Sequence, residues 1–240
     1  MMKLNILAFA AHPDDVELSC SGTILKHIKL GYKVGIIDLT SGELGTRGTA
    51  DIRSLESKEA SSVMGIHVRE NLQMKDGFFR NDEDHQRILI KAIRKYQPDI
   101  VLCNAITDRH IDHGRGAQLE SDACFLSGLS KIETFDDAGV LQEAWRPKSV
   151  YHYIQDHFIV PDLLVDISEE WEHKLKTISC FKSQFYDPHS IEPLTPIATK
   201  EFMEFLPARA LNFGRIIGVR YAEGFTVIKG IGVNDLTKLI

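Results

Sequence analysis

The segment Leu4-Asn5-Ile6-Leu7-Ala8-Phe9-Ala10-Ala11-His12-Pro13-Asp14-Asp15-Val16-Glu17 decides the fold of this 240-residue chain. Its first half is apolar and has the length of a buried strand, whereas its second half carries a histidine and two adjacent aspartates. Open α/β proteins place their chemistry at the carboxyl ends of their strands. We therefore expect a strand over residues 3–10 and a functional site directly after it.

Apolar runs alternate with segments of helical periodicity along the rest of the chain. The predicted strands cover residues 3–10, 33–39, 67–72, 99–104, 149–154, 163–167 and 225–228. The predicted helices cover residues 16–30, 52–64, 84–96, 116–127 and 169–181. This alternation favours a Rossmann-like α/β fold, with a mostly parallel sheet and helices on both faces. Because the sequence has no internal repeat and no linker, we expect a single domain over residues 1–240.

Residues 187–207 form the least regular segment, because they contain Pro188, Pro193, Pro196 and Pro207. Prolines at this density oppose regular structure. The segment is therefore expected to be either a mobile flap near the site or a plain surface loop.

The composition narrows the class of protein. A net charge of -6 argues against nucleic-acid binding, and no apolar stretch reaches the roughly 18 residues that span a bilayer. The apolar N-terminal segment is shorter than a signal peptide, so we expect a cytoplasmic protein. The four widely spaced cysteines do not form a disulfide framework and are expected to be reduced, buried thiols.

A second cluster, Asp108-Arg109-His110-Ile111-Asp112-His113, follows the apolar run Ile100-Val101-Leu102-Cys103. Two such clusters at two strand ends can meet in space and hold a metal. His12, Asp15 and His113 then give three ligands and leave one position open, which is typical of a catalytic zinc. Bound zinc lowers the pKa of its water to about 7.

The remaining polar residues of the two clusters suit hydrolysis of an amide. Asp14 is the natural general base beside the metal, and His110 is placed to protonate a leaving amine. Asp112 can orient a histidine. Either cluster alone is equally well explained as a turn followed by a helix cap, so the metal site rests on the two together.

Two arginines are candidate substrate-binding residues. Arg53 follows the polar loop of residues 40–49, and Arg109 suits bidentate pairing with a substrate carboxylate. For both, the alternative is a surface ion pair. Further candidates for the pocket are His152, His157 and His189, and candidates to complete an oxyanion site are Tyr151, His157 and Tyr186.

The two motifs resemble the LmbE-like (PIG-L) family of zinc-dependent N-acetylglucosamine deacetylases. The likeness extends through Gly42-Glu43-Leu44-Gly45-Thr46-Arg47-Gly48-Thr49, Lys182-Ser183-Gln184-Phe185-Tyr186 and Tyr221-Ala222-Glu223-Gly224-Phe225. The chain is most similar to the bacillithiol-biosynthesis branch, which deacetylates N-acetylglucosaminyl-malate. One departure is Ile111, where the family usually has proline.

The resemblance implies a role for each matching residue. It makes His12, Asp15 and His113 the Zn²⁺ ligands, Asp14 the general base, His110 the general acid and Asp112 the residue that tunes it. It also implies that Arg53 holds sugar hydroxyls and that the chain forms a homo-oligomer, often a hexamer. Fe²⁺ suits the same ligands and is an alternative metal.

We therefore expect a metal-dependent hydrolase that deacetylates a small-molecule N-acetylglucosamine conjugate. Two alternatives remain open. One keeps the enzyme and changes the substrate to another N-acetyl sugar or a thiol conjugate. The other is a non-enzymatic sugar-binding or metal-binding protein on the same fold, which would need neither Asp14 nor His110.

Overall fold

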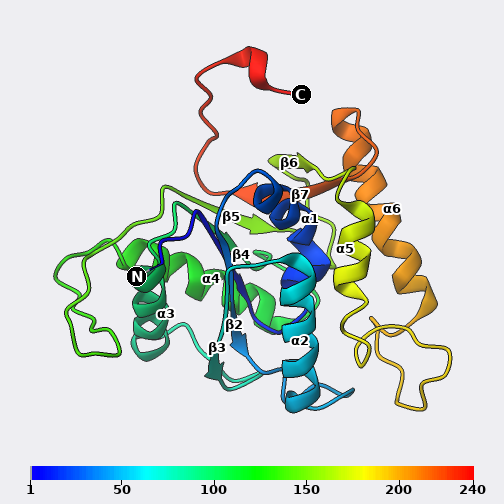
Figure 1. Ribbon diagram of the computed structural model, residues 1–240, viewed down its shortest axis with the longest axis horizontal. Coiled ribbons are helices and arrows are strands. Elements are labelled where there is room, and N and C mark those ends of the chain that lie inside the picture. The colour runs from blue at the N-terminus through cyan, green and yellow to red at the C-terminus, as the bar shows by residue number, and fades with distance from the viewer. Residues whose placement is uncertain (1) are drawn as a thin grey trace.

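The computed structural model describes residues 2–240 and has a single seven-stranded sheet as its centre (Figure 1). The spatial order of the strands is β3-β2-β1-β4-β5-β7-β6. Strands β1 to β5 pair in parallel, and β7 pairs antiparallel with both β5 and β6. The strand bounds are β1 Ile6–Ala10, β2 Val34–Thr40, β3 Val68–Met74, β4 Ile100–Cys103, β5 Ser149–Tyr153, β6 Leu163–Asp166 and β7 Ala222–Val227.

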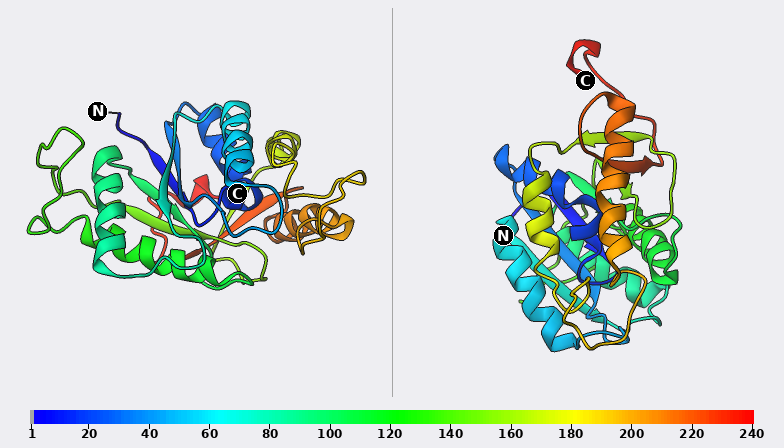
Figure 2. Two further views of the ribbon diagram at one scale, coloured as in Figure 1. Left: turned by 90° about the horizontal axis from the view of Figure 1, so that it is seen from below. Right: turned by 90° about the vertical axis from the view of Figure 1, so that its right-hand side faces the viewer.

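Helices cover both faces of this sheet, as Figure 2 shows. Helices α3 and α4 pack on one face, and α1, α2 and α5 lie on the other, while α6 packs against β7. The helix bounds are α1 Asp15–Lys29, α2 Ala50–Met64, α3 Glu83–Tyr96, α4 Ile111–Leu126, α5 Trp171–Ile178 and α6 Lys200–Ile217, followed by the short 3-10 helix η1 Leu236–Lys238. The predicted Rossmann-like α/β architecture is confirmed.

The central strand β1 is buried along its whole length, which explains why its sequence is continuously apolar. Leu7 and Phe9 face the α3 and α4 side, whereas Ile6, Ala8 and Ala10 face α1. Because β1 lies between β2 and β4 in the interior of the sheet, the turn that follows it lies over the carboxyl edge of the sheet.

Helix α6 corrects the prediction for residues 187–207. The irregular segment ends at Thr199, whose hydroxyl accepts a hydrogen bond from the Phe202 N–H and begins a helix that continues through Pro207. Burial of Leu206, Ala210 and Phe213 on one face outweighs the backbone bond that the proline removes.

Helix α4 begins at Ile111, five residues before its predicted start at residue 116. Gly114 and Gly116 hide this first turn in the sequence, because glycine is a weak helix former. The difference matters, because it places His110 at the N-cap of a helix whose first turn carries Asp112 and His113.

Helix α1 is interrupted at Cys20, where the backbone leaves the helical region. The carboxylate of Glu223 in β7 accepts hydrogen bonds from the N–H groups of Gly22 and Thr23 at 3.0 and 2.7 Å. Lys174 donates to the same carboxylate at 2.6 Å. A buried ion pair therefore ties α5 and β7 to the break in α1.

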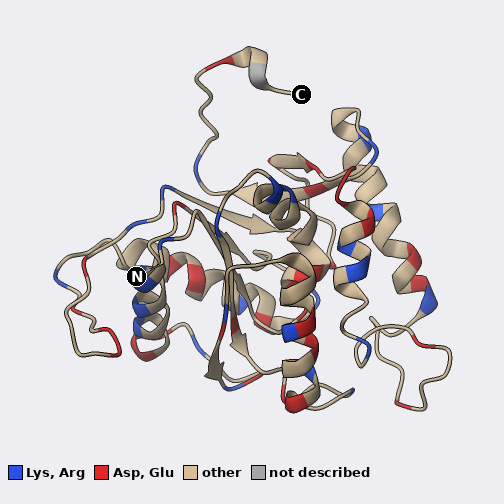
Figure 3. Cartoon of the chain, viewed as in Figure 1, with Lys and Arg blue, Asp and Glu red and all other residues tan. Residues whose placement is uncertain are grey.

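Three further features bear on the class of protein. In the described part of the chain, no helix is long and apolar enough to cross a membrane. Figure 3 shows acidic and basic residues interspersed on α2, α3 and α5. All four cysteines are buried and free, as expected.

Candidate metal and catalytic site

Both sequence clusters meet above the carboxyl edge of the sheet. His12 follows β1, and His110 and His113 flank the start of α4, which follows β4. The imidazole ring of His12 has its centroid 4.7 Å from that of His110 and 5.6 Å from that of His113. The structure thus brings together three histidines from segments almost one hundred residues apart.

The carboxylate of Asp15 lies between two of these rings. Its Oδ1 is 3.0 Å from Nε2 of His113, and its Oδ2 is 3.8 Å from Nδ1 of His12. Two ligands of one tetrahedral zinc lie roughly 3.3 Å apart, given metal–ligand bonds of about 2.0–2.1 Å. The two separations lie on either side of this value, although they reach different oxygens of Asp15. Among the described residues, the predicted trio of His12, Asp15 and His113 is not one of the sets whose ligand atoms all come within 4.8 Å of one another.

The opposite nitrogen of each imidazole faces a carboxylate. His12 Nε2 lies 3.0 Å from Asp76 Oδ1 and 3.4 Å from Asp112 Oδ2. His113 Nδ1 lies 2.5 Å from Asp108 Oδ2. Metal-binding histidines usually have their second nitrogen held by a carboxylate in this way.

These carboxylates create a strongly negative site. Burial disfavours the charged form of His12, but its bonds to Asp112 and Asp76 raise its pKa to about 9. Burial likewise opposes ionisation of His113, yet Asp15 and Asp108 raise its pKa to about 10. The site favours a bound cation, which can be a proton or a metal ion.

Two sets of side chains within residues 2–240 bring one possible ligand atom each to within 4.8 Å of one another. They are His12, His110 and His113, and His12, Asp76 and Asp112. His12 belongs to both. Imidazole nitrogen and carboxylate oxygen are donors that Zn²⁺ and Fe²⁺ accept, so the residues present fit such an ion.

Asp14 occupies the turn between β1 and α1 in a strained conformation. Its φ of 116° lies in a region that residues other than glycine rarely adopt. The Arg53 guanidinium holds the carboxylate, with Nη2 3.1 Å from Oδ2. Burial raises the pKa of Asp14 to about 7, although Arg53 opposes the shift. Backbone strain and a perturbed carboxyl group are both typical of functional residues.

Arg53 itself is buried and is tied to the turn that carries Asp14. Its Nη2 donates to the carbonyl oxygen of Pro13, and its Nη1 donates to that of Gly42 at 3.4 Å. Gly42 has a φ of 63°, and a Cβ there would overlap the guanidinium. The structure thus gives Arg53 contacts with the protein that the sequence did not predict.

His110 is held by the helix that it caps. Its Nδ1 accepts a hydrogen bond from the Asp112 N–H at 3.2 Å, so Nε2 is the nitrogen left for the cavity. Burial and the nearby charges of His12 and His113 lower the pKa of His110.

The Asp112 side chain departs from expectation. It turns away from the cap and faces His12, with Oδ2 also accepting the Gly77 N–H at 2.8 Å and Oδ1 accepting Arg115 Nη1 at 2.6 Å. The closest histidine to its carboxylate is therefore His12 rather than His110.

Sequence reasoning missed two amides beside Asp15. Asn104 donates to Oδ2 of Asp15 at 3.1 Å, and Gln155 donates to Oδ1 at 3.0 Å. Asn104 directly follows β4, and Gln155 comes two residues after β5. Asp76 likewise follows β3. The rule that selected His12 and Asp15, a polar residue at the end of a strand, would have found Asn104 and Gln155. It would not have found Asp76, because the third strand was expected to end at residue 72.

The cavity at this site has a volume of about 570 Å³ and is lined by His12, Asp14, Asp15, His110 and His113. Loop residues 44–47 and the segment from Thr195 to Ile197 lie at its wall, so part of the irregular segment does border the site. Arg109 also lines it, but its Nε is 2.7 Å from Asp156 Oδ2. Several candidates are absent from the lining that the described residues form: Tyr151, His152, His157, Tyr186 and His189.

Comparison with known proteins matches residues 7–124 to the PIG-L family model, described as GlcNAc-PI de-N-acetylase. Diacetylchitobiose deacetylase of Thermococcus kodakarensis is 28% identical over 236 residues, which cover 94% of this chain and 84% of that protein. A conserved protein from Thermus thermophilus superposes with a TM-score of 0.84 at 30% identity, covering 97% of this chain and 98% of its own. N,N'-diacetylchitobiose deacetylase from Pyrococcus horikoshii gives a TM-score of 0.79 at 28% identity, covering 98% and 88%.

Proposed function

This chain belongs to the PIG-L family of de-N-acetylases, and from that premise we propose that it releases acetate from a small N-acetylglucosamine conjugate. Deacetylation is hydrolysis of an amide, and the family is metal-dependent. N-acetylglucosaminyl-malate, the precursor in bacillithiol biosynthesis, is the specific substrate we propose. The convergence of His12, Asp15 and His113 beside Asp14 carries the proposal.

We assign the metal to Nδ1 of His12, the carboxylate of Asp15 and Nε2 of His113. The support is that the other nitrogen of each ring already faces a carboxylate outside this trio, which leaves Nδ1 of His12 and Nε2 of His113 to bind an ion. Zn²⁺ is the metal we propose, with Fe²⁺ as the alternative. When bound, such an ion polarises the acetyl carbonyl and makes water a nucleophile at neutral pH.

Asp14 receives the proton of the attacking water in this scheme. Arg53 engages its Oδ2, so Oδ1 is the oxygen left to accept the proton. The left-handed backbone at Asp14 fixes the direction of the carboxylate, which a relaxed turn would not do. A positioned base of this kind contributes about 10²–10⁴-fold to the rate.

His110 donates to the departing amine through Nε2. Its Nδ1 accepts the Asp112 N–H, so the ring as it stands is neutral. It must take up a proton at Nδ1, at the expense of that bond, before it acts as an acid. Asn104 and Gln155 keep Asp15 in place and take no proton themselves.

The test is acetate release by the purified protein. Asp14→Asn should lower kcat by about 10²–10⁴-fold while metal content, measured by plasma mass spectrometry, stays unchanged. Asp84→Asn on the exposed surface of α3 is the matched control and should keep full activity. Near-normal turnover in the Asp14 variant would reject the assignment.

The competing readings give different results in the same assay. A sugar-binding protein would bind N-acetylglucosamine and release no acetate, with or without metal. Comparison of N-acetylglucosaminyl-malate with diacetylchitobiose and free N-acetylglucosamine separates the branches of the family. We also propose that the protein is cytoplasmic and forms a homo-oligomer, with six subunits as the family resemblance implies. Light scattering after gel filtration measures the number of subunits directly.

A further inference from the structure

Four arginines line the cavity, and three of them are already engaged. Arg47 donates to the carbonyl oxygens of Ser183 and Pro193 and to the Ser190 hydroxyl. Arg53 pairs with Asp14, and Arg109 pairs with Asp156. The fourth is Arg209, which projects from α6.

Arg209 makes few contacts for a cation in this position. In the described chain its guanidinium donates one hydrogen bond, from Nη2 to the carbonyl oxygen of Leu18 at 3.2 Å, and lies over the Phe205 ring. No carboxylate of residues 2–240 lies within ion-pair distance of it. Burial disfavours the charged form and lowers the pKa of Arg209.

The carboxylates whose charges reach Arg209 all have closer cations. Asp156 pairs with Arg109 at 2.7 Å and Asp108 with His113 at 2.5 Å. Glu223 pairs with Lys174 at 2.6 Å. None of them is available as a counterion, so the guanidinium keeps an unpaired charge facing the cavity.

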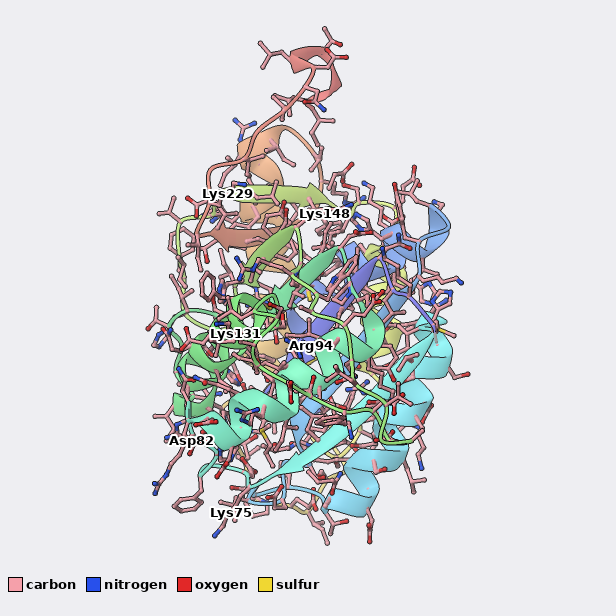
Figure 4. The ribbon with its side chains drawn as sticks, turned by 90° about the vertical axis from the view of Figure 1, so that its left-hand side faces the viewer. Lys75, Asp82, Arg94, Lys131, Lys148 and Lys229 are labelled. Atoms are coloured by element: carbon pink, nitrogen blue, oxygen red, sulfur yellow. The ribbon has the colours of Figure 1, made fainter. Side chains whose placement is uncertain are left out.

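Arg94 shows what a structural arginine looks like in this fold. It is 2% exposed and also lacks a carboxylate partner, yet its nitrogens donate to the carbonyl oxygens of Ser127, Leu129 and Ile132 and to the Thr134 hydroxyl. Figure 4 labels Arg94, which lies on α3 and is not among the residues that line the cavity. Arg94 therefore organises a loop, whereas most donors of Arg209 have no such partner.

We propose that Arg209 determines substrate choice by binding an anionic group on the aglycone of the N-acetylglucosamine conjugate. The inference rests on the proposed function and adds the residue that would bind the negative charge of the substrate. A guanidinium pairs with a carboxylate or a phosphate through two parallel hydrogen bonds, and in a half-buried site such pairs are strong. Arg47 and Arg53 could not take this role without breaking contacts of their Nη groups. Arg109 engages only its Nε, but its charge is already balanced by Asp156.

The test compares an anionic with a neutral substrate in wild-type protein and in Arg209→Gln. The variant should lose about 10- to 100-fold in kcat/KM on N-acetylglucosaminyl-malate, chiefly through KM, and stay within about twofold on methyl α-N-acetylglucosaminide. N-acetylglucosamine 1-phosphate is the second anionic substrate and shows whether phosphate is read as well. Arg209→Lys should recover part of the loss, because lysine keeps the positive charge but cannot form two parallel hydrogen bonds to the anion.

Arg215→Gln is the matched control. Arg215 is exposed on the same helix, so its replacement removes the same charge outside the cavity. An equal loss on neutral and anionic substrates, or no loss on either anionic substrate, would overturn the inference. Calorimetric titration with L-malate decides it without turnover, since binding should weaken in Arg209→Gln and not in Arg215→Gln. Wild-type protein that releases no acetate from any substrate refutes the proposed function separately.

Discussion

The carboxylate of Asp14 lies 3.1 Å from the guanidinium of Arg53, which joins the turn after β1 to the first part of α2. Both side chains are buried. The same guanidinium binds the carbonyl oxygens of Pro13 and Gly42, so three separate points of the turn and the neighbouring loop converge on it. Arg53 acts as the positioning residue for the proposed base.

Replacement of Arg53 should therefore reduce turnover without removing the metal. Arg53→Lys keeps the charge but cannot reach Asp14, Pro13 and Gly42 together, so we expect kcat to fall by about 10-fold and KM to change less. Arg53→Gln should lower kcat further than Arg53→Lys does. Metal content by mass spectrometry and the circular dichroism spectrum serve as controls. A loss that appears only in KM would instead make Arg53 a substrate-binding residue, as the sequence first indicated.

Asp76 should control metal affinity although it is not a proposed ligand. Its Oδ1 faces His12 Nε2 at 3.0 Å, and its Oδ2 accepts the Leu44 N–H at 2.9 Å. Asp76→Asn keeps the shape and removes the charge that orients the imidazole, so metal should bind about 10- to 100-fold more weakly. Competition with a chromophoric chelator measures this, with Asp84→Asn as the control. Unchanged affinity would mean that His12 does not bind metal through Nδ1.

The sequence predicted the parts of the site that follow from strand ends. His12 and Asp15 come after β1, and the second cluster comes after β4, so a parallel sheet necessarily brings them to one edge. Asp76 escaped because the third strand was expected to stop at residue 72 and runs to Met74. The end of a strand is set by its pairing with neighbours, which periodicity does not contain.

The other differences between the sequence analysis and the structure come from contacts between distant segments of the chain. The family resemblance implied that Asp112 tunes His110, whereas the start of α4 directs its carboxylate to His12. Arg109 was expected either to bind a substrate carboxylate or to form a surface ion pair, and the structure pairs it with Asp156, which follows β5. Helix α6 was hidden by Pro207, because the burial that stabilises it involves residues far along the chain.

The pair of Glu223 and Lys174 should be important for stability. Both side chains are 4% exposed, and burial lowers the pKa of Lys174. Glu223→Gln leaves a buried ammonium without its counterion, which should lower the free energy of unfolding by roughly 3–5 kcal/mol in urea titrations. Glu169→Gln is the control, because it removes the exposed pair between Lys29, at the end of α1, and Glu169, just before α5, and should leave the midpoint unchanged. Equal midpoints for the two variants would contradict this account.

Glu120 should make stability fall as the pH rises. It is fully buried in α4, where its Oε2 accepts the Asn104 N–H at 2.8 Å, and burial raises its pKa from 4.5 to about 8. Between these two values the folded chain holds a proton that the unfolded chain releases, so its contribution is complete below pH 4.5 and is lost as the pH rises through about 8. Glu120→Gln keeps the acceptor oxygen and carries no charge. Glu120→Gln should therefore become more stable relative to the wild type as the pH rises over this range, as urea titrations of both proteins measure. A difference in unfolding free energy that stays constant from about pH 5 to about pH 9 would show that Glu120 is ionised in the folded protein.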